Sequence, residues 1–181
     1  MLNRLLPVLA ALGLTLALTS GAASAYEQTY TPTAPGEIQL KELPQALALE
    51  APDGDDEGFR ALFNFIQSNE LAMTVPVEVD LSDEREAMRF FAPSARLASP
   101  PPSADGVQVK ALPPRTVVSL GHRGRGGDRQ RGQDIVTLQR WIAENPEWRA
   151  IGAPIAVYWD GPFTPFFLRR SEVMIELSPA G

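Results

Sequence analysis

The sequence predicts a single α+β domain built from two strand-strand-helix-strand-strand units. Short segments of alternating apolar and polar residues indicate strands, and two segments with an apolar stripe at helical spacing indicate helices. Residues 38–44, Ile-Gln-Leu-Lys-Glu-Leu-Pro, closely match residues 107–113, Val-Gln-Val-Lys-Ala-Leu-Pro. Because the order of elements repeats with this match, we interpret it as an internal duplication with pseudo-repeats at about 38–91 and 107–177. Neither half has enough apolar residues to form its own core, so the halves are expected to form one domain.

The first unit is predicted to contain strands at residues 38–43, 46–50, 72–79 and 88–91, and a helix that ends at about residue 68. Acidic residues just before the helix favour its start, because they complement the positive end of the helix dipole. The helix has one apolar stripe at positions i, i+3, i+4 and i+7, made by Phe59, Leu62, Phe63 and Ile66. Phe65 widens that face. Pro76 inside the third strand predicts an edge or a bulge there.

The second unit is predicted to contain strands at residues 107–112, 116–120, 155–159 and 172–177, and a helix at 129–144. A proline-rich loop at residues 92–106 joins it to the first unit. The apolar face of its helix comprises Ile135, Leu138, Trp141 and Ile142. Pro146 follows the expected end of this helix.

A loop rich in aromatic residues precedes the last strand, with the sequence Gly-Pro-Phe-Thr-Pro-Phe-Phe-Leu at residues 161–168. Its prolines exclude a regular helix or a central strand. Because exposed aromatic side chains are costly, we expect the loop to pack against the rest of the protein. It could form one wall of a site for an apolar ligand, or it could only plug the core.

The chain begins with a segment typical of exported proteins. Residues 1–25 combine one early positive charge, an apolar run and the sequence Ala23-Ser24-Ala25, which together predict a secretory signal peptide cleaved after Ala25. A membrane anchor is the alternative, but the apolar run is short for a span. We therefore expect a periplasmic or secreted protein without a membrane span, with an extended arm at residues 26–37 and the domain at 38–181.

Composition excludes several classes of function. The net charge of −6 argues against binding of nucleic acid. The chain has no cysteine and one histidine, so it has neither disulfide nor thiolate chemistry and no metal site of several histidines. The serines lie in no nucleophile motif, and we identify no catalytic residues.

Three stretches together resemble the SOUL family of haem-binding proteins. They are the helix at 58–66 leading to Ala-Met-Thr-Val-Pro-Val at 72–77, the segment Arg-Phe-Phe-Ala-Pro-Ser at 89–94, and Pro-Phe-Thr-Pro-Phe-Phe-Leu-Arg-Arg-Ser-Glu-Val at 162–173. The resemblance spans about residues 26–177. It implies a duplicated α+β domain in which a distorted antiparallel β-barrel is flanked by two helices. It also implies binding of haem or a related tetrapyrrole in an apolar cleft.

In family members that bind without a histidine ligand, the cleft lies between the first helix and the loop before the last strand. Carried onto this chain, the helix side comprises Phe59, Phe63 and Asn64, and the loop side comprises Trp159 and Phe163. Some members have a basic residue at the position of Asn64, which could meet a haem propionate; here that charge is missing.

His122, the one histidine, lies in the glycine-rich sequence Gly-His-Arg-Gly-Arg-Gly-Gly at residues 121–127. It does not clearly match the histidine proposed as ligand in the founding member, so it is either an axial ligand of haem iron or an exposed loop residue. Arginines 123, 125, 129 and 131 form a basic tract. They could be a solvated loop, or they could meet haem propionates or anionic lipid.

The expected function is therefore that of an exported carrier or buffer of a tetrapyrrole rather than an enzyme. One alternative is a binder of another hydrophobic ligand in the cell envelope. Another is an enzyme on the same scaffold, with Glu78 or Glu172 as a base. A carboxylate with a raised pKa inside the cleft would favour the enzyme.

Overall fold

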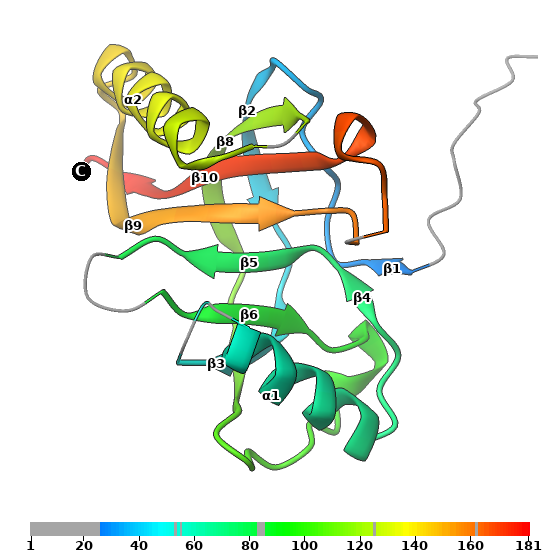
Figure 1. Cartoon of the computed structure of the whole chain (residues 1–181). Helices are drawn as coiled ribbons and strands as arrows, with labels where there is room; N and C mark the ends of the chain where they lie inside the picture. Colours follow the sequence, from blue (N-terminus) through cyan, green and yellow to red (C-terminus); the bar gives the residue numbers. More distant parts are fainter. Residues whose placement is uncertain (1–25, 53, 55, 83–85, 125, 162) are drawn as a thin grey trace, which may run out of the picture.

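The computed structural model describes residues 26–52, 54, 56–82, 86–124, 126–161 and 163–181 (Figure 1). The expected signal peptide at 1–25 and Arg125 therefore lie outside the described residues. In chain order the elements are β1 (Glu27–Gln28), β2 (Ile38–Leu43), β3 (Ala46–Ala51), α1 (Asp56–Ser68), β4 (Thr74–Val75), β5 (Val77–Asp80), β6 (Met88–Phe91), a 3₁₀ turn (Ser94–Arg96), β7 (Gln108–Leu112), β8 (Arg115–Arg123), α2 (Asp128–Glu144), β9 (Trp148–Tyr158), a second 3₁₀ turn (Phe166–Leu168) and β10 (Arg170–Pro179).

One antiparallel sheet of eight strands has the order β2-β8-β10-β9-β5-β6-β3-β7. The counterparts in the two units are β2 and β7, β3 and β8, β5 and β9, and β6 and β10. When each strand in this order is replaced by its counterpart, the result is the same order read from the opposite end. The pair β5–β9 lies at the centre of this symmetry, with Val79 opposite Ala156. The α+β class and the repeated order of elements are therefore as predicted. The symmetric order supports the interpretation that the chain is duplicated.

The prediction of a barrel is wrong, because the sheet is open, with β2 and β7 at its edges. The structure shows where closure fails. β2 pairs with β8 up to Leu43 opposite Arg115, and β3 pairs with β7 from Ala46 opposite Leu112. Between these two ladders stand Pro44 on one side and Pro113–Pro114 on the other. Prolines have no backbone N–H to donate, so the ladder is interrupted at the place where it would have to be continuous.

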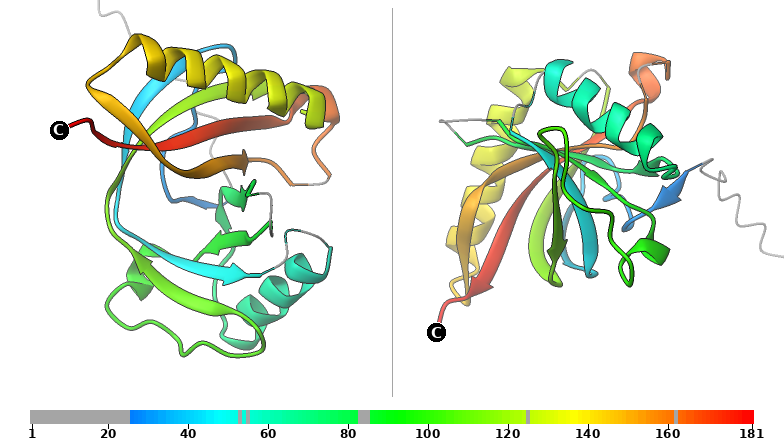
Figure 2. Two further views of the ribbon diagram at one scale, coloured as in Figure 1. Left: turned by 90° about the vertical axis from the view of Figure 1, so that its left-hand side faces the viewer. Right: turned by 90° about the horizontal axis from the view of Figure 1, so that it is seen from below.

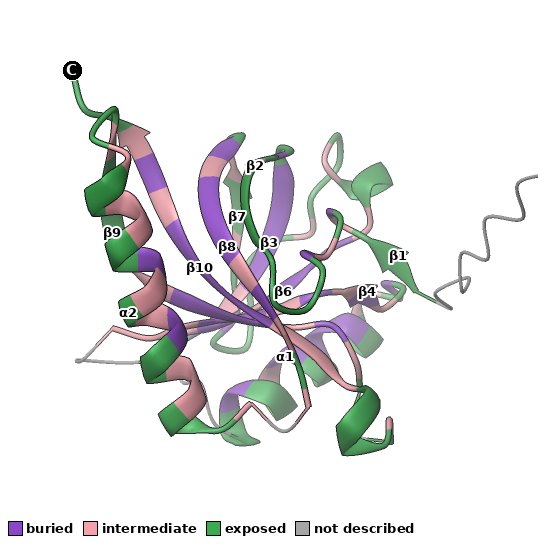
Figure 3. Cartoon of the chain, turned by 90° about the horizontal axis from the view of Figure 1, so that it is seen from above, coloured by how far each residue is buried: buried purple, intermediate pink, exposed green. Residues whose placement is uncertain are grey.

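The two helices cover different parts of the sheet. α1 packs on β3 and β6, and α2 packs on β8, β9 and β10, as Figure 2 shows from two further sides. The buried side of α1 comprises Leu62, Phe65 and Ile66, and Leu138 is the fully buried apolar residue of α2. The side of α2 that faces away from the sheet is exposed (Figure 3). The apolar face predicted for α2 packs on the sheet, whereas of the stripe predicted for α1 only Leu62 and Ile66 are buried, together with Phe65.

Besides the core under α1 and the core under α2, a third core lies on the opposite face of the strands. Alternation along β8 shows this directly, because Val118 packs in the core with Leu138 whereas Val117 packs with Tyr30, Phe91 and Trp159. The segment at residues 26–37, expected to be an extended arm, contributes to this core. Tyr30 is only 8% exposed and makes edge-to-face contacts with Phe91 and Trp159.

Two buried glutamates, Glu78 and Glu172, lie in this third core and have charged partners. Arg89 and Arg115 donate to Glu78 at 2.7 and 3.0 Å, and the hydroxyl of Tyr30 donates to it at 2.7 Å. Lys41 donates to Glu172 at 2.8 Å. Glu172 also accepts bonds from the Thr33 backbone N–H, the Ser119 hydroxyl and the Trp159 indole. The arm is thereby tied to both glutamates, since buried charges need such partners.

Tyr30 makes the stability of the fold sensitive to alkaline pH. Burial, followed by the charge of Glu78, raises the pKa of its phenol well above the ordinary value. The folded chain keeps this proton when the unfolded chain loses it, so the contribution is complete below about pH 10 and is lost as the pH rises further. We expect Tyr30→Phe to lose less stability than the parent between about pH 9 and 11. Urea denaturation across this range checks it, and parallel curves for the two proteins would contradict it.

Within the described residues, no helix has the length and apolar composition required to cross a membrane.

Candidate functional site

An open cleft of about 760 Å³ lies between α1, the central strands and the loop before β10. Its volume falls in the range typical of small-molecule sites, which is roughly 300–1,000 Å³. Most of its lining side chains are apolar. They come from α1 (Phe59, Phe63), from the segment around β4 and β5 (Met73, Val75, Val77, Val79, Leu81), from β6 (Met88) and from β9 and the loop that follows it (Tyr158, Trp159, Phe163). The cleft lies over the β5–β9 pair, which is also the centre of the symmetric strand order.

The helix side of the cleft is an edge of α1 that the core does not use. Phe59 and Phe63 are 40% and 38% exposed, whereas Leu62, one position away, is fully buried. The two rings stack at 6.3 Å between centroids with planes 10° apart, and Phe59 also contacts Phe90 edge to face. The apolar surface of α1 is therefore wider than packing on the sheet requires. Its surplus, Phe59 and Phe63, lines the cleft.

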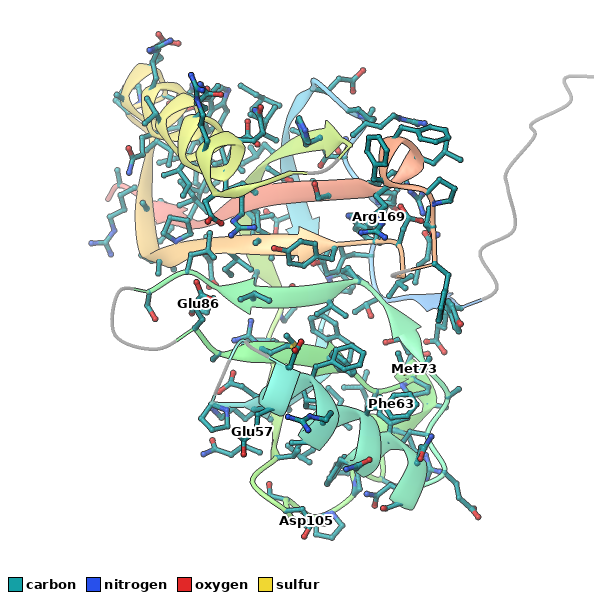
Figure 4. All side chains as sticks on the ribbon, viewed as in Figure 1. Glu57, Phe63, Met73, Glu86, Asp105 and Arg169 are labelled. Atoms are coloured by element: carbon teal, nitrogen blue, oxygen red, sulfur yellow. The ribbon has the colours of Figure 1, made fainter. Side chains whose placement is uncertain are left out.

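The strand side of the cleft comes from residues that the sequence analysis did not select. Val77 and Val79 on β5 and Tyr158 on β9 line it, with Met73 before β4. Figure 4 shows Phe63 and Met73 on one side of this region and Arg169 on the other, near the start of β10. Alternation could have identified Tyr158, because a strand that turns Val157 and Trp159 to one face turns Tyr158 to the opposite one.

The remaining expected site residues have different outcomes. Trp159 lines the cleft but is only 2% exposed, and its indole N–H donates to Glu172 at 2.8 Å, so most of the ring belongs to the third core. Phe163 lines the rim and is 98% exposed, which contradicts the expectation that its loop packs down on the protein. Asn64 is exposed on α1 and is not among the residues that line the cleft.

Arginines gather at the end of the cleft near β10. Arg131 of α2 donates to the Tyr158 hydroxyl at 3.1 Å and is paired with Asp128. Arg170 is paired with Asp160 at 2.8 Å, and its backbone N–H also donates to that carboxylate at 2.7 Å. The opposite end of the cleft carries Glu86, at the far end of β5 (Figure 4). The cleft is therefore apolar along its length and cationic at one end.

Asp160, a carboxylate that lines the cleft, is ionised. Its partial burial alone would raise its pKa, but hydrogen bonds from the side chain and backbone of Arg170 outweigh burial and lower the pKa below the ordinary value. This carboxylate therefore balances Arg170 and does not act as a proton donor or acceptor near neutral pH.

Glu78 and Glu172, the two bases considered from the sequence, are fully buried in the third core and are not among the residues that line the cleft. Their oxygens are occupied by the cations and hydroxyls described above. Among the described residues, no group of three or more histidines and carboxylates is placed to hold a metal ion.

His122 is on a strand rather than in the loop after it. β8 continues to Arg123, and His122 pairs with Ser171 of β10. Gly124 and Gly126 follow it and line the cleft, whereas His122 itself does not. A Cβ atom added at Gly126 would lie 3.9 Å from His122 Cδ2 and 3.1 Å from Ser171 Oγ. His122 therefore lies next to the glycine turn, outside the lining of the cleft.

Solved structures with the same fold are only distantly related in sequence. The C-terminal domain of EcmrR superposes with a TM-score of 0.60 at 15% identity, covering 80% of this chain and 98% of that domain. A protein described as a hydrolase from Listeria innocua superposes with a TM-score of 0.55 at 14% identity, covering 82% of this chain and 94% of that one. At these identities the likeness shows the fold alone. Among curated proteins, none matches this chain.

A family model gives a more specific relationship. The model described as "SOUL heme-binding protein" matches residues 24–176, which include every helix and nearly every strand described above. The motifs at residues 72–77 and 162–173 fall inside this match. The chain therefore belongs to the SOUL haem-binding family.

Proposed function

We propose that this protein binds haem or a related tetrapyrrole in the cleft between α1 and the β9–β10 loop, as a carrier or buffer. The observation that supports this most is the exposed pair Phe59 and Phe63, which faces an apolar cleft instead of the core. A flat ring system buried against stacked aromatic and aliphatic side chains gains most of its affinity from removal of apolar surface from water.

The residues of the cleft fit such a ligand. A tetrapyrrole with carboxylate side chains combines a large apolar body with anionic groups at one edge. The cleft offers aliphatic and aromatic side chains along its length, and it offers Arg131 and Arg169 at one end. Guanidinium groups donate well to carboxylates, and they can replace the basic residue that is missing at Asn64. We expect Arg131 to contribute most, because its bond to Tyr158 orients it at the cleft wall.

The lining of the cleft offers candidates for an iron ligand other than His122. Side chains of the types that ligate haem iron in other proteins include the thioethers of Met73 and Met88 and the phenol of Tyr158, and all three line the cleft. Iron bound there would supply redox and ligand-binding chemistry, whereas the protein supplies burial and the arginines.

We expect haem binding to survive the loss of His122. Titration of the purified protein with haem, followed by the absorbance spectrum, should give a saturable change with one haem per chain. His122→Ala should keep this change within about threefold in affinity, because the residue lies outside the cleft lining. Complete loss of the haem spectrum in a folded His122→Ala protein would contradict the assignment of the site.

The same titration separates the proposal from its main competitor. Binding of an apolar dye without any saturable haem signal would favour the alternative, a site for another hydrophobic ligand.

Export remains part of the proposal, since the mature protein is expected to begin at Tyr26. Mass spectrometry of the exported protein tests this, and a chain that retains residues 1–25 would contradict it.

A further inference from the structure

We propose that the aromatic loop, defined as residues 161–168, docks on an anionic lipid surface. Its described apolar side chains face water: Phe163 is 98% exposed, Phe166 51%, Phe167 59% and Leu168 46%. Scattered apolar residues are common on protein surfaces, but a group of neighbouring rings on one loop marks an interaction site. This inference is independent of the nature of the ligand in the cleft.

Polar contacts fix the backbone of the loop, and the rings of Phe166 and Phe167 contact each other edge to face. The Arg169 side chain donates to the carbonyl of Thr164 at 2.8 Å, and the Asp160–Arg170 ion pair fixes the two chain ends. Backbone N–H groups of Thr164 and Leu168 bond inside the loop, at 3.1 and 2.9 Å. Backbone donors that already have partners lower the cost of moving a segment into a less polar environment.

Positive charge lies beside the loop. Arg123 at the end of β8 is exposed and pairs in the ladder with Arg170, which follows the loop. Arg129 in the first turn of α2 is also exposed. Residues 161–171 contain no aspartate or glutamate. Basic groups next to inserted apolar side chains are the combination that binds anionic bilayers.

The area of the patch favours a lipid surface over a second copy of the chain. The exposed fractions of the three phenylalanines add up to about two whole side chains. An aromatic side chain has an area of roughly 200 Å², so the exposed apolar area is ~400 Å². A stable protein interface buries roughly 800 Å² on each partner. A small group of rings on a loop is sufficient for insertion among lipid headgroups, because the fluid surface adapts its shape. Phe163 also lines the cleft rim, so docking would bring the cleft opening close to the lipid.

The absence of cysteine from the sequence allows a position-specific test. An environment-sensitive fluorophore is attached to Phe163→Cys, and to Val136→Cys on α2 as the matched control, since Val136 is also exposed, at 54%. Both proteins, each purified as the mature chain that begins at Tyr26, are mixed with vesicles of equal parts phosphatidylcholine and phosphatidylglycerol. We expect a blue shift at position 163 and none at 136. The shift should weaken in high salt and with vesicles of phosphatidylcholine alone.

A double change on the same background shows whether the rings cause binding. Phe166→Ser with Phe167→Ser should lower partitioning into the vesicles at least about tenfold, because two exposed rings are no longer available to enter the lipid. Three outcomes would overturn the proposal: no shift at 163 with anionic vesicles, partitioning unchanged by the double change, or a shift at 163 without vesicles that grows with protein concentration. The last outcome would show that the loop joins two copies of the chain.

Discussion

Glu78→Ala is expected to destabilise the protein by about 3–5 kcal/mol, which is a large part of the stability of a typical domain. The carboxylate is fully buried and pairs with Arg89 at 2.7 Å and Arg115 at 3.0 Å. Both guanidinium groups are themselves mostly buried, and each already has an Nε atom without a partner among the described residues. Removing Glu78 takes the close carboxylate partner from Arg115 and the acceptor from the Tyr30 hydroxyl, and it leaves Arg89 with Glu50 alone, at 2.9 Å. The cost is mainly that of a buried charge that has lost its partner.

Urea denaturation of the parent and the variant measures this effect. Glu42→Ala is the matched control, because Glu42 is an exposed glutamate on β2 whose partner is the Thr116 hydroxyl. We expect the control to change stability by no more than about 0.5 kcal/mol. A Glu78→Ala protein within about 1 kcal/mol of the parent would show that the buried ion pairs of Glu78 contribute little to stability.

The second large effect separates the two faces of α1 with neighbouring residues. Leu62→Ala should cost about 2–5 kcal/mol in stability, since Leu62 is fully buried in the core. Phe63→Ala should cost about 1 kcal/mol, because its ring is 38% exposed, but it should weaken haem binding tenfold or more. Denaturation curves and haem titrations on the same preparations give both numbers. If Phe63→Ala unfolds the protein, or if it binds haem as the parent does, the helix side of the cleft has been assigned wrongly.

Much of the fold could be predicted because its signals are local. The alternation in residues 172–177 and the helical spacing of Leu62 and Ile66 depend only on neighbours in the chain, and both elements appear in the structure. The strand at Met88–Phe91 has the predicted bounds. Closure of the sheet depends on hydrogen bonds between distant segments. Closure fails at Pro44 and Pro113–Pro114, which lack backbone N–H donors. The sequence does not show that the segment β2–β3 pairs with the segment β7–β8 at these prolines.

The candidate site was predicted less completely, because sequence shows which residues are apolar but not which of them face solvent. Phe59 and Phe63 were expected at the cleft from the family resemblance, and both line it. Trp159 lines the cleft but contributes little surface to it, because its indole N–H donates to Glu172 in the core. Tyr158, on the other face of the same strand, lines the cleft without having been selected.

The exposure of Phe163 could not be predicted from composition, which favours burial of aromatic rings. In the structure, Arg169 bonds to the Thr164 carbonyl and Arg170 pairs with Asp160, and these contacts between segments of the loop cannot be read from composition.

The central claim is that a tetrapyrrole lies in the cleft over the β5–β9 pair, and paramagnetic broadening tests its location directly. Ferric haem broadens the nuclear magnetic resonance signals of nearby residues, whereas zinc protoporphyrin, which is diamagnetic, does not. We predict that Phe63, Met73, Val77 and Tyr158, which line the cleft, lose their signals with haem and keep them with the zinc compound. Leu138 and Trp148, in the core under α2, should keep their signals with both. Broadening centred on that core or on Tyr30, with unchanged signals in the cleft, would contradict the account.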